Sequence, residues 1–139
     1  MTLTREQIMN MPEGRELDTL VAQHIMELTI VPDGLKYSPR YYLPEYKETY
    51  HREVPNYSTN ISAALEVVEK MRKNKIYLDI RVWPEEYQVL PHQDEHNKLI
   101  EHCIVKSPSL PEAICKAALL ASLGAVSYTH LRAHETKAN

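Results

Sequence analysis

The stretch SLPEAICKAALLASLG, residues 109–124, decides how this chain folds, because it predicts a helix with almost no polar face. Ser109 and Glu112 form a Ser-x-x-Glu capping box, and Pro111 fits the first turn of a helix. From residue 113 to residue 123 the stretch is apolar on nearly every side, and Gly124 is a typical stop signal. Such a helix is expected to be buried.

Two amphipathic segments earlier in the chain predict further helices. The first opens at Pro12, which suits a first helical turn. Its apolar side chains recur at helical spacing: Leu17, Leu20, Val21 and Ile25. The second follows residues 55–60, and its predicted buried stripe is Ile61, Leu65, Val68 and Met71. Thr4 and Gln7 form another capping box, which predicts a helical turn near the start.

The segments between these helices predict β-strands. Residues 76–83 alternate between apolar and polar, which predicts a strand with two unlike faces. Residues 98–105 are apolar on both faces, as in a central strand, and residues 28–31 are a shorter candidate. Pro84, Pro91 and the polar run 92–97 predict a hairpin with a long loop. The order of elements predicts an α+β fold, a layered α/β/α sandwich with a small, mostly antiparallel sheet and three helices.

The composition argues against several classes of partner and of activity. The charge is −3 without a basic run, which disfavours duplex nucleic acid and anionic membranes. No apolar run approaches the ~18–20 residues of a membrane span. Cys103 and Cys115 fit a reducing cytosol, where thiols pack as small apolar groups. There is no glycine-rich phosphate loop and no catalytic constellation, so we expect a binding protein without a cofactor.

The end of the chain does not read as native protein. Residues 126–136, VSYTHLRAHET, match one reading frame of a transposon-type sequencing adapter at every position. The chain is therefore interpreted as an open reading frame from a metagenomic assembly that continues into adapter. On this interpretation residues 1–125 form a single domain and residues 126–139 are a non-native tail. For the same reason, the histidines of that tail are not interpreted as metal ligands.

Three blocks of the chain resemble the phage ABA-sandwich proteins. They are LTREQIMNMPEGRELDTLVA (residues 3–22), PNYSTNISAALEVVEKM (55–71) and PEAICKAALL (111–120), and their order and spacing agree with that family. The chain departs from the family after Met26, where a glycine and a nearby tryptophan are common, and residues 37–50 have no counterpart. The resemblance implies a phage protein with an ABA-sandwich fold.

The resemblance extends to small phage proteins that counter the Thoeris defence by sequestering its cyclic ADP-ribose-type signal. It implies an anti-defence protein in the cytoplasm of the infected bacterial host, which binds a cyclic nucleotide without cleaving it. We also expect a homo-oligomer. The alternative hypothesis is a protein-binding or structural phage factor that blocks a host protein through a tyrosine-rich arm. A nucleotide-cleaving enzyme would need a general base, and none is recognisable in the sequence.

A nucleotide-binding site needs an aromatic face for the base and donors for phosphate. The turn at residues 57–60 supplies both at a helix start, through Tyr57, Ser58, Thr59 and Asn60. Arg81 and Trp83 point to the same side of the predicted strand and could hold a phosphate and a base together. Two structural alternatives stay open. Ser58 or Asn60 can be a plain helix cap, and Arg81 can pair with Asp79 under a covering element.

Tyrosines crowd between residues 37 and 57 of a chain that has no phenylalanine: Tyr37, Tyr41, Tyr42, Tyr46, Tyr50 and Tyr57. Three prolines in the same region argue against a single helix. The segment is interpreted as a lid over a ligand, an arm that embraces another subunit, or a solvent-facing loop.

The histidines before the tail are candidates for metal ligands or core residues. His92 and His96 have the spacing of two ligands on one helix face, but no third ligand is evident and no metal site is predicted. His24 falls on the apolar side of its helix, which predicts a core or interface position. His102 and Cys103 are neighbours on a predicted strand and so face opposite ways, which excludes a direct thiol–imidazole dyad.

Overall fold

The computed structural model describes residues 3–32, 38–46, 50–93 and 98–124. The predicted helices are present as α2 (Arg15–His24), α3 (Ile61–Lys73) and α4 (Leu110–Leu119), the last continued by a π-helical turn, η3 (Leu120–Gly124). The helical turn expected near the start is the short helix α1 (Arg5–Asn10), and its Thr4–Gln7 capping box is formed. The predicted tail at residues 126–139 lies outside the described residues.

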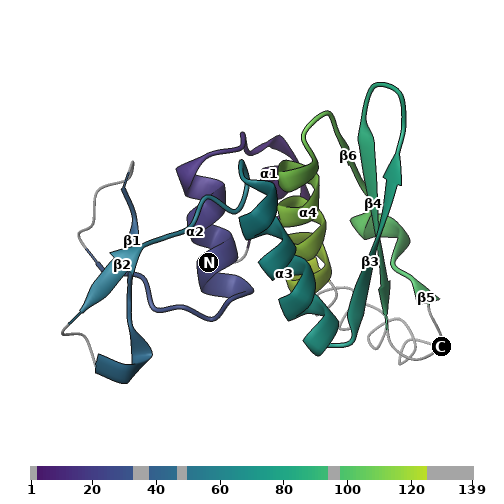
Figure 1. Cartoon of the computed structure of the whole chain (residues 1–139). Helices are drawn as coiled ribbons and strands as arrows, with labels where there is room; N and C mark the ends of the chain where they lie inside the picture. The colour runs from purple at the N-terminus through teal and green to yellow at the C-terminus, as the bar shows by residue number, and fades with distance from the viewer. Residues whose placement is uncertain (1–2, 33–37, 47–49, 94–97, 125–139) are drawn as a thin grey trace.

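Helix α4 is buried, as its sequence predicts, and lies at the centre of the fold. Its side chains are buried from Ala113 through to Ala121, and α1, α2 and α3 all contact it (Figure 1). Even Lys116 is buried, with its ammonium donating to the carbonyl of Met9 at 2.9 Å. Each fully buried Ile or Leu stabilises the fold by roughly 1.5–3 kcal/mol, so α4 holds the other helices together.

The larger sheet is antiparallel and has four strands: β3 (Ile76–Val82), β4 (Tyr87–Gln93), β5 (Lys98–Leu99) and β6 (Val105–Ser107). The prediction of a long hairpin loop is wrong, because β3 and β4 are joined by a tight turn. In this turn Trp83 donates its backbone N–H to the Glu86 carbonyl at 2.9 Å. Pro91 lies inside β4, where the neighbouring strand changes from β6 to β5, so its missing N–H costs no ladder bond.

The continuous strand predicted over residues 98–105 is also wrong. β5 and β6 lie along the same edge of β4 and are separated by a 3₁₀ turn, η2 (Glu101–Cys103). The turn carries Cys103 inward, so that Ile100, Cys103 and Val105 all reach the core. The apolar residues on both sides of the pattern therefore reflect a turn that folds back on the core, rather than a strand that is covered on two faces.

The helices lie between two sheets (Figure 1). α3 packs on β3, and α4 packs on β4 and β6. On the other side of the helices is a two-stranded sheet made of β1 (Arg40–Tyr42) and β2 (His51–Glu53), with a 3₁₀ turn, η1 (Pro44–Tyr46), after β1. The strand expected at residues 28–31 is reduced to one bridge between Ile30 and Tyr41. The predicted α+β class and antiparallel pairing are confirmed, but the layers are ordered sheet, helices, sheet rather than helices, sheet, helices as predicted.

Candidate functional site

The turn before α3 contains four of the six residues predicted to bind a ligand, and two of them are buried. Tyr57 is 2% exposed and Ser58 is fully buried, whereas Thr59 and Asn60 are exposed. Asn60 is the N-cap of α3, and its side-chain oxygen accepts from the Ala63 N–H at 3.1 Å. Burial, reinforced by the charge of Glu66, raises the pKa of the Tyr57 hydroxyl, which therefore stays protonated.

Ser58 is held in a polar network that we call the α2–α3 junction: Gly14, Arg15, Asp18, Asn56 and Ser58. The Ser58 hydroxyl accepts from the Gly14 N–H at 2.9 Å and donates to the Gly14 carbonyl at 3.2 Å. The Ser58 N–H donates to the buried Asp18 carboxylate at 2.7 Å. These bonds join the start of α2 to the turn before α3, so Ser58 serves the fold.

Arg15 completes the junction from its edge. Its guanidinium is paired with Asp18 at 2.7 Å and also donates to the side chain of Asn56 and the carbonyl of Val54. Asp18 is not part of the apolar series predicted for its helix, yet it is fully buried. The spacing of Arg15 and Asp18, three residues apart, is the signal from which a local ion pair could have been inferred.

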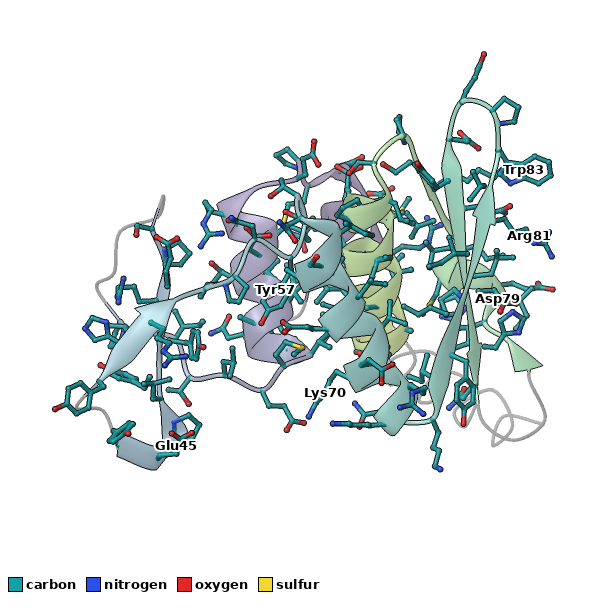
Figure 2. The ribbon with its side chains drawn as sticks, viewed as in Figure 1. Glu45, Tyr57, Lys70, Asp79, Arg81 and Trp83 are labelled. Carbon is teal, nitrogen blue, oxygen red and sulfur yellow. The ribbon has the colours of Figure 1, made fainter. Side chains whose placement is uncertain are left out.

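The other two predicted ligand residues, Arg81 and Trp83, lie at the far end of β3 and point away from the helices (Figure 2). Within the described part of the chain, the guanidinium of Arg81 has neither a hydrogen-bond nor an ion-pair partner. The alternative Asp79–Arg81 bridge is not formed there, because Asp79 pairs with His92 at 2.8 Å. Trp83 is 49% exposed, and its indole N–H donates to Gln88 at 3.2 Å.

The structure does not bring these two groups of residues together in one chain. Figure 2 shows Tyr57 on one side of α3, and Arg81 and Trp83 beyond the sheet on its other side. Each group would therefore have to contact a ligand without the other. The exposed arginine and tryptophan on β3 are the more accessible of the two groups.

A third surface is a shallow, open depression of about 450 Å³ along α3. Its lining mixes apolar and charged side chains: Met26, Ser62, Leu65, Glu66, Glu69, Lys70 and Lys73. The buried stripe predicted for α3 is shifted, since Ala64, Val67 and Met71 are buried whereas Ile61 and Leu65 are 42% and 48% exposed. Ala64 therefore lies on the side of α3 that packs in the core, and the larger Ile61 and Leu65 lie on its exposed side.

The tyrosine-rich segment forms a projecting structure that we call the arm, residues 38–46 and 50–53. The arm lies apart from the larger sheet, on the opposite side of the helices (Figure 1). Tyr41 packs against the core, whereas Tyr46 and Tyr50 are 50% and 58% exposed. Their rings meet edge to face with centroids 5.0 Å apart. Tyr37 lies outside the described residues.

The buried thiols are poorly suited to nucleophilic chemistry. Burial raises the pKa of Cys103 to about 12, although the nearby charge of Arg5 acts in the opposite direction. Burial also raises the pKa of Cys115, helped by the carboxylate of Asp18. Both thiols are therefore protonated at neutral pH, whereas a reactive cysteine is a thiolate.

The core position expected for His24 is wrong, because His24 is exposed at the end of α2. His92 lies in β4 with its side chain towards Asp79, and His96 falls outside the described residues. In the part of the chain that the structure describes, no three His, Cys, Asp or Glu side chains gather as metal ligands.

Comparison with known proteins identifies the family. The model of the phage ABA sandwich domain matches residues 19–119, which include α3, α4 and the whole larger sheet. No curated protein and no solved structure matches the chain. No helix among the described residues is long and apolar enough to cross a membrane. The chain belongs to the phage ABA sandwich domain family.

Proposed function

We propose that this phage protein binds a protein of its bacterial host through the arm and blocks that protein without chemistry of its own. The observation that carries the proposal is the Tyr46–Tyr50 pair, two half-exposed aromatic rings that are packed against each other on a projecting ribbon. Exposed aromatic side chains with a polar hydroxyl are enriched where proteins bind proteins.

The arm is also ordered by contacts of its own, which lowers the cost of binding. Arg40 donates to the ring and to the carbonyl of His51 across the ribbon, and the His51 ring lies edge to face with Tyr42. Tyr41 ties the base of the ribbon to the core. Side chains that are already ordered lose less conformational entropy when a partner arrives, so more of their contact energy becomes affinity.

A pull-down from a lysate of the bacterial host, quantified by mass spectrometry, tests the arm. The double variant Tyr46→Ala/Tyr50→Ala removes the exposed pair, and Ile61→Ala/Leu65→Ala is the matched control, with similarly exposed side chains on α3. We expect a host protein that is retained by the wild type and the control, and whose affinity for the arm variant falls about tenfold or more, as for interface hot spots. Equal retention by all three chains would overturn the proposal.

Sequestration of a host cyclic nucleotide immune signal, of the cyclic ADP-ribose type, is the second candidate. It is favoured by Arg81, whose guanidinium is unpartnered among the described residues, and by the exposed indole of Trp83. Such a protein would act in the cytoplasm of the infected host and release its ligand unchanged. It ranks second because a sequestering site normally encloses most of its ligand, whereas the predicted residues lie on two separate faces.

Calorimetric titration separates the two candidates. The chain is titrated with cyclic ADP-ribose isomers and with cyclic di- and trinucleotides, and bound ligand is recovered after denaturation and analysed. Tight binding that Arg81→Ala/Trp83→Ala abolishes, with intact ligand recovered, would establish sequestration. Conversion of the ligand to a product would show an enzyme, and no binding by any member of the panel would leave the arm as the functional surface.

A further inference from the structure

We propose that strand β3 pairs antiparallel with β3 of a second copy of this chain, about a two-fold axis that passes through Ile80. β3 is at the edge of the larger sheet and has β4 as its only neighbour in the described part of the chain. The interface is separate from the arm, so it stands or fails independently of the proposed host-protein binding.

The hydrogen-bond pattern of β3 determines which of its residues can pair on the open side. Trp83 donates its N–H to Glu86 in the turn, and the register continues from Val82 opposite Tyr87. Because donors and acceptors alternate along an antiparallel ladder, the odd-numbered residues of β3 bond to β4. The N–H and C=O groups of the even-numbered residues therefore point to the open edge: Ile76, Leu78, Ile80 and Val82.

Three registers of a β3 pair would place the two-fold axis near the middle of the exposed half of the strand, and their charges distinguish them. An axis through Asp79 sets the two Asp79 carboxylates opposite each other, and an axis through Arg81 does the same to two guanidinium groups. Directly opposed like charges destabilise a strand pair. An axis through Ile80 instead sets each Asp79 opposite Arg81 of the second copy.

The Ile80 register also pairs the remaining side chains by type. On the outer face, Asp79 opposes Arg81 and Tyr77 opposes Trp83, at positions where side chains of an antiparallel pair approach most closely. On the inner face, Ile80 opposes its own copy and Leu78 opposes Val82. The segment IYLDIRVW, β3 with the following Trp83, is thus self-complementary in charge, aromatic character and apolar character in this one register.

The exposure of the strand supports this pairing. Val82 is 74% exposed and Ile80 is 36% exposed, although both lie on the face that carries the core residue Leu78. Edge strands are usually protected by proline, lysine or a bulge, and β3 has no proline or lysine within it. In the registers centred on Asp79 or Arg81, like charges of the two strands would face each other and repel. In the Ile80 register, opposite charges face each other and attract. Arg81, which lacks a partner among the described residues, gains one.

A pair of charge reversals tests the interface and its register together. Asp79→Arg places two positive charges on each strand, and Arg81→Asp places two negative charges there. Each variant alone should raise the monomer–dimer Kd about tenfold or more, because both cross-strand pairs become repulsive. An equimolar mixture of the two variants should recover a dimer of near wild-type affinity, since every pair is again of opposite charge.

Sedimentation equilibrium measures the Kd, native mass spectrometry shows whether the recovered dimer contains one chain of each variant, and circular dichroism confirms that each variant is folded. Glu16→Arg and Lys73→Asp, which make the same charge changes at exposed positions outside the sheet, should leave the Kd unchanged. Three results would each overturn the proposal: a wild-type chain that stays monomeric at millimolar concentration, reversals that do not weaken the dimer, or folded variants whose mixture forms no heterodimer.

Discussion

The α2–α3 junction and the outer face of β3 contain the same kinds of polar side chain and use them in opposite ways. At the junction, Asp18 and Ser58 are fully buried and bonded to α2 or to the turn before α3. On β3, Asp79 and Arg81 are exposed, and only Asp79 has an ion-pair partner in the described part of the chain. The comparison teaches that burial, rather than residue type, decides whether a polar group belongs to the fold or is open to a partner.

The physical reason is desolvation. A buried carboxylate or hydroxyl must recover inside the protein the hydrogen bonds it gave up in water, and the Asp18 carboxylate and the Ser58 hydroxyl do so through bonds within the chain. An exposed guanidinium keeps its water and needs no partner within its own chain. Four predictions follow this contrast, from the largest expected change in stability to the smallest.

Replacement of Asp18 by alanine should cause the largest loss of stability. It leaves the Arg15 charge and the Ser58 N–H without their buried acceptor, and we expect a loss of about 3 kcal/mol in the free energy of unfolding. Asp79→Ala is the matched control, because it removes an exposed carboxylate whose partner, His92, is charged only when protonated, and it should cost less than about 1 kcal/mol. Urea denaturation measures both, and equal losses would show that the junction is not a special site.

High pH should destabilise the fold through its buried thiols. Unfolded thiols ionise from pH 9.0, but burial holds the pKa of Cys103 at about 12 and raises that of Cys115. The folded chain therefore keeps protons that the unfolded chain releases. Stability is complete below pH 9 and falls towards pH 12, by about 2–3 kcal/mol between pH 8 and pH 10 if both thiols contribute.

Thermal or urea denaturation across this pH range measures the effect. The double variant Cys103→Ala/Cys115→Ala should lose stability less steeply with pH than the wild type, because it has no thiols to titrate. An identical slope in both chains would mean that other groups, such as the buried Tyr57, cause the loss.

Ser58→Ala sharpens the comparison within the junction itself. It removes the hydroxyl that bonds to both backbone groups of Gly14, and leaves a partly buried N–H and C=O without that partner. We expect a cost of about 1–2 kcal/mol. Ser62→Ala, at an exposed position on α3, should change stability by less than about 0.5 kcal/mol. If Ser58→Ala and Ser62→Ala changed the free energy of unfolding equally in denaturant titrations, the fold would not need the Ser58 hydroxyl, which would then be available to bind a ligand.

The smallest change is expected on β3. Arg81→Ala and Trp83→Ala remove side chains that the fold of a single chain does not use, apart from the bond between Trp83 and Gln88. At chain concentrations where the wild type is monomeric, each should alter the free energy of unfolding by about 0.5 kcal/mol or less. A larger loss in dilute solution would place these residues with the junction, as parts of the fold.

The local patterns of the chain predicted a large part of this fold. Helix α4 and its complete burial, the Thr4–Gln7 capping box and the alternation of β3 all follow from neighbouring residues. Such features depend on local backbone geometry that repeats with a fixed period, so they can be recognised from the spacing of residues in the sequence. The structure does not bring the six candidate ligand residues together. Of these residues, Tyr57 and Ser58 are buried, Asn60 is a helix cap, and Arg81 and Trp83 lie on another face.

The errors share one cause, because each concerns a position whose environment comes from a distant segment. Pro91 seemed to exclude a strand, yet β4 accepts it where its neighbour changes. Cys103 looked like part of a central strand, yet it faces the core from a turn. Periodicity within one segment carries no information about which segment will cover it, so these positions could not be predicted locally.

By itself, the sequence determined the family, the helices and the identity of the buried centre, because apolar periodicity selects local structure and burial together. Only the tertiary structure decided that Asp18 and Ser58 are internal, that the tyrosines project on a ribbon, and that β3 has an open edge. Those properties depend on which surfaces meet when the chain closes. That outcome is set by packing between residues far apart in the sequence, such as Gly14 and Ser58.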